Sequence, residues 1–81
     1  MTVKVLYFGR LKELSGAAEE TIELRDGAVI EDLFSRCSAG RPELRKFRRS
    51  LVAARNREFA AWNTPLCPDD EVGFLPPVSG G

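Results

Sequence analysis

The stretch that decides the fold of this chain is Val29-Ile30-Glu31-Asp32-Leu33-Phe34-Ser35-Arg36-Cys37. Its apolar residues recur at positions i, i+1, i+4, i+5 and i+8, which places them along one side of a helix. A helix of this kind buries its apolar side against another layer of the protein. We therefore predict one main helix over residues 29–37, lying on a sheet formed by the segments on either side of it.

Two strands are predicted before this helix. Residues 3–8 are rich in β-branched and aromatic side chains, a composition typical of a largely buried strand. Residues 20–24 alternate apolar and polar side chains and end at an Asp-Gly turn signal. Between the two strands, the spacing of Leu11 and Leu14 predicts one helical turn. We expect the two strands to pair as a hairpin.

A short second helix and three strands are predicted after the main helix. Pro42 suits the first helical position, and Leu44, Phe47 and Leu51 continue the apolar spacing. Strands follow at residues 51–55, 59–62 and 71–75, with a turn at 56–58 and a loop at 65–70. This order predicts an α+β domain over residues 1–75, in which the helix and short helical turns cover one face of a single mixed sheet. The order resembles that of the ubiquitin-like β-grasp.

Composition bounds what such a domain does. The chain has 81 residues, 43% of them hydrophobic and 30% charged, which is typical of one small soluble domain. Twelve basic and twelve acidic residues give a net charge of zero, so we expect no nucleic-acid partner. The first apolar run is too short for a signal peptide or a membrane span, which predicts a cytoplasmic protein with no membrane partner.

The reactive side chains are few. The chain has no histidine, which excludes Ser-His-Asp and Cys-His catalysis and histidine zinc sites. Cys37 lies on the apolar side of the main helix, where we expect it to be inert, and Cys67 lies in a loop. The acidic run 69–71 is interpreted as a turn leading into a strand, so no metal site is predicted. The basic residues at positions 41–57 are interpreted as a solvated helix face.

The C-terminus carries the chemistry that the rest of the chain lacks. Pro76 and Pro77 cannot continue a sheet ladder, and they favour an extended tail over residues 76–81. The last four residues are Val78, Ser79, Gly80 and Gly81. Because glycine has no Cβ, a Gly-Gly ending can pass through a narrow channel and present its carboxylate to a reactive centre on another protein. We predict a flexible tail of six residues that inserts into a partner.

Three runs of this sequence resemble the small subunit of molybdopterin synthase, the MoaD-type family of sulfur carriers. They are residues 70–81, residues 4–8 and Ala53-Ala54-Arg55-Asn56. The resemblance implies that an E1-like adenylyltransferase uses ATP and Mg to adenylate Gly81, and that a sulfur-donating enzyme then supplies sulfur for a C-terminal thiocarboxylate. It also implies that the tail enters the large synthase subunit, in a heterotetramer, and gives its sulfur to a cyclic pyranopterin monophosphate. The chain itself would bind no cofactor, and the catalytic side chains would belong to the large subunit.

The resemblance also implies a docking surface on the sheet. It would include Phe8, Phe59 and Leu75, with Lys12 as a basic contact and residues 76–80 as the inserted tail. The competing interpretation is that the three apolar side chains are core. Gly73 is interpreted as a close packing contact or a bulge in the last strand.

Other functions stay open at this point. A ubiquitin-like modifier would share the activation step and then form isopeptide bonds through Gly81. A sulfur carrier for thiamine synthesis or another pathway is disfavoured by the Pro-Pro-Val-Ser context of the tail. A basic binding module would rest on the arginines of residues 41–57, and a sulfur-transfer role for Cys67 is disfavoured.

Overall fold

The computed structural model describes residues 1–76, and the predicted tail residues Pro77, Val78, Ser79, Gly80 and Gly81 lie outside the described part. The division into a domain over 1–75 and a tail over 76–81 therefore stays a prediction. The elements in chain order are β1 (Thr2–Tyr7), α1 (Arg10–Ser15), β2 (Glu19–Glu23), α2 (Ile30–Ser38), α3 (Pro42–Arg45), the 3-10 turn η1 (Arg48–Ser50), β3 (Val52–Arg55), β4 (Glu58–Ala60) and β5 (Glu71–Leu75).

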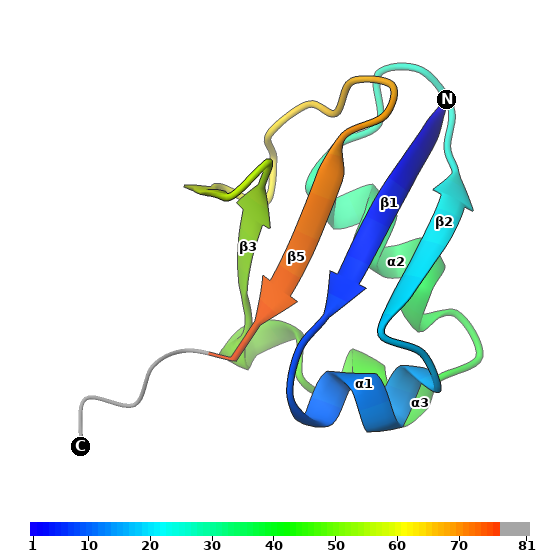
Figure 1. Ribbon diagram of the computed structural model, residues 1–81, viewed down its shortest axis with the longest axis vertical. Coiled ribbons are helices and arrows are strands. Elements are labelled where there is room, and N and C mark those ends of the chain that lie inside the picture. The colour runs from blue at the N-terminus through cyan, green and yellow to red at the C-terminus, as the bar shows by residue number, and fades with distance from the viewer. Residues whose placement is uncertain (77–81) are drawn as a thin grey trace.

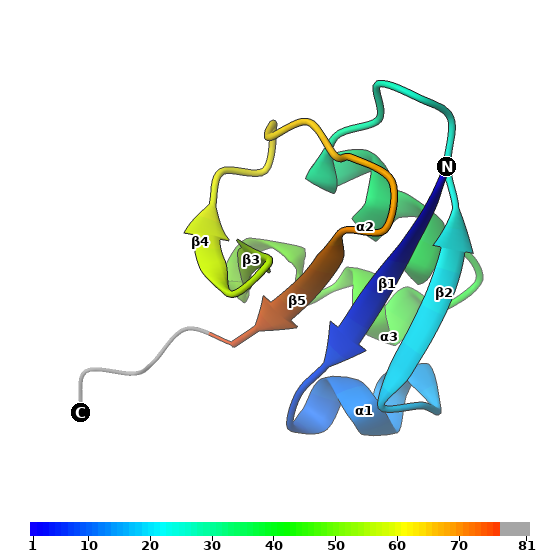
Figure 2. The ribbon, with the colours of Figure 1, turned by 45° about the horizontal axis from the view of Figure 1, so that its top comes forward.

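The strands form one five-stranded sheet in the order β2-β1-β5-β3-β4. The central strands β1 and β5 are parallel, and the other three neighbouring pairs are antiparallel. Helix α2 crosses one face of this sheet (Figure 1), and the turned view shows β4 at the edge beside β3 (Figure 2). The predicted α+β arrangement, a mixed sheet covered by one main helix, is confirmed. The predicted pairing of the first two strands is also confirmed.

The core lies between α2 and the sheet. Because side chains alternate across a strand, every second residue of β1 and β5 points inward, and Val5, Val72 and Phe74 are fully buried. Phe74 stacks on Trp62 with ring centroids 5.5 Å apart, and Phe34 of α2 meets Phe74 edge-on at 5.1 Å. Such aromatic pairs add to the hydrophobic stabilisation of the area that they bury. The aromatic cluster therefore fixes α2 onto β5.

Local chemistry explains where α2 begins. The backbone N–H of Val29 donates to the Asp32 carboxylate at 2.9 Å, so the acidic side chain bonds a free donor at the start of the helix. The carboxylate also lies near the positive end of the helix dipole. The buried positions Ile30, Leu33, Phe34 and Cys37 belong to the predicted apolar stripe. The main helix thus lies within one residue of its predicted bounds.

The segment after α2 differs from the prediction at two places. The short helix that begins at Pro42 ends at Arg45, and the chain then tightens into η1, where Ser50 N–H bonds to Phe47 C=O with i to i−3 spacing. The return strand, predicted at 59–62, is instead Glu58–Ala60. Trp62 leaves the sheet edge because its ring packs against the aromatic cluster.

The described helices are short. Among residues 1–76, none has both the length and the apolar composition needed to cross a membrane.

Candidate functional site

The outer face of the sheet, opposite α2, is divided into a polar and an apolar half. Strand β2 presents Glu19, Thr21 and Glu23 there, all exposed. The half formed by the ends of β1 and β5 and by β3 and β4 carries apolar side chains instead. Its most exposed large members are Phe59 at 79%, Phe8 at 41% and Val52 at 38%. An exposed apolar patch of this kind on a small domain is typical of a surface that meets a partner.

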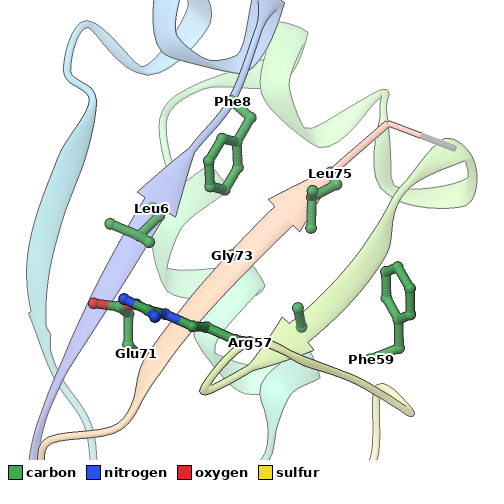
Figure 3. Close-up of a pocket in the computed structure, with 8 residues that line it drawn as sticks. Leu6, Phe8, Arg57, Phe59, Glu71, Gly73 and Leu75 are labelled. Atoms are coloured by element: carbon green, nitrogen blue, oxygen red, sulfur yellow. The ribbon is translucent and has the colours of Figure 1, made fainter. Parts of the chain in front are cut away.

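A groove of about 220 Å³ is cut into the apolar half. Its lining comes from β1 and the residue that follows it, from β3, β4 and β5, and from the turn between β3 and β4. The lining residues are Leu6, Phe8, Ala54, Arg57, Phe59, Glu71, Gly73 and Leu75. Figure 3 shows Phe8 and Leu75 at one end of the groove and Phe59 along its side. Most of the lining is apolar, with one basic and one acidic side chain.

The missing side chain of Gly73 makes the floor of the groove. Gly73 lies in register between Leu6 of β1 and Ala54 of β3. A Cβ built on Gly73 would lie 3.0 Å from Cε2 of Phe8, so the aromatic ring occupies the space that a side chain would need. The predicted close packing contact at Gly73 is therefore confirmed. A larger residue here would displace Phe8 and fill the groove.

Arg57, the basic side chain of the groove, lies in a tight turn. Asn56 and Arg57 join β3 to β4 with φ values of 50° and 72°, the left-handed conformation that a two-residue hairpin turn requires. From this turn the Arg57 side chain extends across the groove toward Glu71 (Figure 3). The groove therefore offers a cation as well as an apolar wall to whatever docks there.

A buried carboxylate holds that turn in place. Asp70 accepts hydrogen bonds from Arg55 Nε at 2.6 Å, Asn56 Nδ2 at 2.9 Å and the Cys67 backbone N–H at 2.8 Å. Burial alone would raise the pKa of Asp70, but these three donors outweigh it and lower the pKa below its ordinary value. Arg55, the last residue of β3, pairs in register with β4 and β5 and forms an ion pair with Asp70. The acidic run is thus a turn into β5, as interpreted from the sequence.

The structure brings together three of the four predicted docking residues outside the tail. Phe8, Phe59 and Leu75 all line the groove, and the exposure of Phe8 and Phe59 excludes the core interpretation for both. Lys12 is exposed on α1, which lies at the end of the sheet toward which β1 and β5 point (Figure 1), and it does not line the groove. Pro76 is exposed directly after β5, and Pro77, Val78, Ser79, Gly80 and Gly81 lie outside the described residues. Binding of a partner to these residues stays a prediction.

The sequence reasoning missed four lining residues: Leu6, Ala54, Arg57 and Glu71. The signal for Leu6 was present, because a strand places Leu6 on the same face as Phe8. Ala54 is the cross-strand partner of Phe59, and Glu71 lies on the same face of β5 as Leu75. Nothing in the sequence indicated that Arg57 would extend across the groove, since that depends on the turn geometry.

The remaining candidate groups are engaged elsewhere. Burial raises the pKa of the Cys37 thiol to about 11, so the inert role predicted for it fits the structure, and Cys67 is exposed. Several basic side chains interpreted as a solvated face are instead paired, among them Arg41 with Glu20 at 2.8 Å and Arg48 with Glu31. Within residues 1–76, no three His, Cys, Asp or Glu side chains gather as metal ligands would.

Comparison with known proteins assigns the chain to a family. The model of the ThiS family matches residues 5–81. The chain belongs to the ThiS family. Two relatives are each named molybdopterin synthase sulfur carrier subunit. The one from Chlamydomonas reinhardtii is 41% identical over the whole of both chains, and the one from Escherichia coli is 36% identical over 98% of this chain and 99% of its own.

Solved structures share the fold at similar coverage. The small archaeal modifier protein 1 of Methanosarcina acetivorans has a TM-score of 0.82 and 27% identity, over 99% of this chain and 96% of its own. A chain in a Helicobacter pylori complex of subunits 1 and 2 of molybdopterin-converting factor has a TM-score of 0.70 and 27% identity, over the whole of both chains. The β-grasp fold expected from the element order is therefore confirmed.

Proposed function

We propose that this chain is the sulfur-carrier subunit of a molybdopterin synthase and acts in the cytoplasm. The observation that carries the proposal is the apolar groove along β5, whose last residue, Leu75, directly precedes residues 76–81. A partner that covers the groove receives the tail at the same time. Relatives that match the full chain bear the sulfur-carrier name, and a similar chain is found in a complex of two subunits, which supports a large-subunit partner.

The proposed chemistry takes place at Gly81 and uses groups from other proteins. Its carboxylate attacks the α-phosphorus of ATP, held with Mg on an E1-like partner, and pyrophosphate leaves. Sulfide delivered by a sulfur-donating enzyme then displaces AMP from the acyl adenylate, so a C–S bond replaces the acyl C–O bond and gives a thiocarboxylate. In the synthase the thiocarboxylate sulfur forms a C–S bond to a cyclic pyranopterin monophosphate in place of an oxygen substituent, and water then hydrolyses the acyl C–S bond and restores the Gly81 carboxylate.

The residues of this chain fit a carrier better than an activating enzyme. The sequence has no Gly-x-x-x-x-Gly-Lys run to hold ATP phosphates and no histidine to act as a base near neutral pH. What the groove provides is recognition: an apolar wall for area burial and Arg57 and Glu71 for orientation. The chain is therefore a co-substrate and donor subunit, and the partners supply the catalytic side chains.

The test is an intact-mass measurement after incubation with the E1-like enzyme, Mg-ATP and a sulfur donor. We expect one oxygen of the chain to be replaced by sulfur, and we expect deletion of Gly81 to abolish that change. The thermal unfolding temperature of the deletion variant serves as the control, because residues 76–81 are predicted to lie outside the domain. Full sulfur transfer by the deletion variant would contradict the proposal.

A second function, a ubiquitin-like modifier, is favoured by the likeness to the archaeal modifier protein. It shares the activated Gly81 but passes the acyl group to lysine amines. Lysine-linked conjugates recovered from the host, with no thiocarboxylate form of the chain, would select this function. A thiocarboxylate without conjugates would select the carrier.

A further inference from the structure

A second hollow, of about 240 Å³, lies on the helical side of the molecule, away from the groove. Three of its residues, Glu31, Phe34 and Ser35, share one face of α2 because they are spaced by three and four positions. The other four are basic and come from the end of α3 through η1: Arg45, Lys46, Arg48 and Arg49. Four cations thus surround one hollow in a chain of zero net charge.

The ion pairs of the described residues leave part of this charge uncompensated. Glu31 is engaged with Arg48 through both carboxylate oxygens, and Lys46 pairs with Glu43 at 3.0 Å. Within residues 1–76, no carboxylate oxygen lies within 4.0 Å of the guanidinium nitrogens of Arg45 or Arg49. Arg45 and Arg49 are exposed, line the hollow and form no direct ion pair there, although Arg45, after Arg48, helps to lower the pKa of the Glu31 carboxyl.

The Arg48 side chain, which lines the hollow, is held in one orientation. Its guanidinium lies 3.5 Å from the centre of the Trp62 ring and donates to Glu31 from Nε at 2.7 Å. Cation–π stacking and a carboxylate pair together hold the side chain in one orientation. Because Arg48 is fixed in this way, Arg45 and Arg49 can converge on a ligand beside a rigid cation and the apolar edge of Phe34.

We propose that this hollow binds a phosphate group, as free phosphate or as a small phosphate monoester. A guanidinium group presents paired N–H donors that match two oxygens of a phosphate, and the hollow has two such groups that form no direct ion pair within residues 1–76. Its volume of about 240 Å³ is below the roughly 300–1,000 Å³ of a site for a drug-sized ligand, so the phosphate group itself is the main part that fits. The proposal concerns a site separate from the sheet groove.

The position of the hollow matters for the carrier function. Residue Val52, which follows η1 by two positions, pairs with Leu75, the last residue of β5. The basic segment therefore lies near the end of the sheet from which the tail continues, but on the helical side. A phosphate bound there leaves the groove open to a docked partner.

The experiment is a titration of the isotopically labelled full chain with sodium phosphate, followed by amide NMR shifts at constant ionic strength. We expect saturable shifts centred on residues 31–35 and 44–50, with the groove residues unmoved. The double variant R45Q/R49Q is expected to weaken binding at least about tenfold, since each lost charge-assisted hydrogen bond contributes more than a neutral one. R45K/R49K should bind with intermediate affinity, because lysine keeps the charge but not the paired donors.

The matched control is R10Q/R36Q, which removes two exposed arginines outside the hollow and should leave the affinity unchanged. Equal weakening by both double variants, or shifts that never saturate, would overturn the proposal by showing general attraction to cations. A parallel titration with AMP identifies the source of the phosphate group. Tighter binding of AMP than of phosphate assigns a nucleotide monoester, and equal binding assigns the free ion.

Discussion

Both faces of the sheet carry aromatic side chains, but these side chains have different roles on the two faces. On the inner face, Phe74 is fully buried between Phe34 and Trp62. On the outer face, Phe8 and Phe59 of the same sheet are 41% and 79% exposed. Burial of an aromatic side chain on folding stabilises the monomer, whereas an exposed one contributes when a second surface covers it. One face therefore determines stability, and the other is available for association.

The largest effect is expected from truncating the inner aromatic. Phe74→Ala removes the centre of the aromatic cluster and leaves a cavity, which should lower the free energy of unfolding by about 3–5 kcal/mol. The matched outer change, Phe59→Ala, should shift it by no more than about 0.5 kcal/mol. Urea denaturation of both variants measures the difference. Equal destabilisation would show that Phe59 is packed in the monomer.

For binding to the partner, we expect the exposed Phe59 to contribute more than the buried Phe74. Phe59→Ser should weaken binding to the proposed large subunit by about 2–4 kcal/mol, because exposed aromatic anchors dominate interfaces. Glu23→Gln, on the polar half of the same outer face, is the control and should change binding by less than about 0.5 kcal/mol. Titration calorimetry with the partner gives both values. If the Phe59→Ser variant binds with the affinity of the parent chain, the groove is not part of the interface.

Asp70 tests whether a buried polar group sets the geometry at the start of β5 and at the turn between β3 and β4. Replacing it by Asn removes a charge that accepts three hydrogen bonds, which should lower the free energy of unfolding by about 1–3 kcal/mol at pH 7. The pKa of Asp70 is lower in the folded chain than its ordinary value. Its contribution is therefore fully present above the unfolded pKa of about 4 and is lost as pH falls through the folded pKa.

The measurement is urea denaturation of the parent and Asp70→Asn chains at several pH values from 7 down to 2. We expect the difference between the two proteins to shrink as pH falls below about 4. The comparison cancels the other carboxylates, which are common to both chains. A difference that stays constant with pH would show that the charge of Asp70 contributes nothing.

The smallest effect concerns the groove floor. Gly73→Ala places a methyl group 3.0 Å from Cε2 of Phe8, and the half-exposed ring can move away. We expect a change of about 1 kcal/mol or less in the free energy of unfolding, because the reduced entropy of the unfolded chain offsets the displacement. Partner binding should weaken more than stability does, but less than in Phe59→Ser. Thermal unfolding and calorimetry on one protein sample separate the two quantities.

Much of the fold could be predicted from local patterns. The helical spacing around Leu33 and the composition of residues 3–8 determine their elements with little help from distant contacts. The end of β4 could not be predicted, because Trp62 leaves the strand to stack on Phe74, a residue far along the chain. The resemblance of the sequence to a known family identified Phe8, Phe59 and Leu75. Arg57 was missed because its direction follows from the left-handed turn at Asn56 and Arg57.

The pairing of β1 with β5 has a consequence for synthesis. The groove needs Leu6 and Phe8 from the first strand and Gly73 and Leu75 from the last, and these strands meet in the centre of the sheet. Contacts between the two ends of a chain form late, because a long loop must close before they are gained. A chain that lacks β5 therefore presents no groove. Partners that recognise the groove select chains in which β5 has been made and has paired with β1.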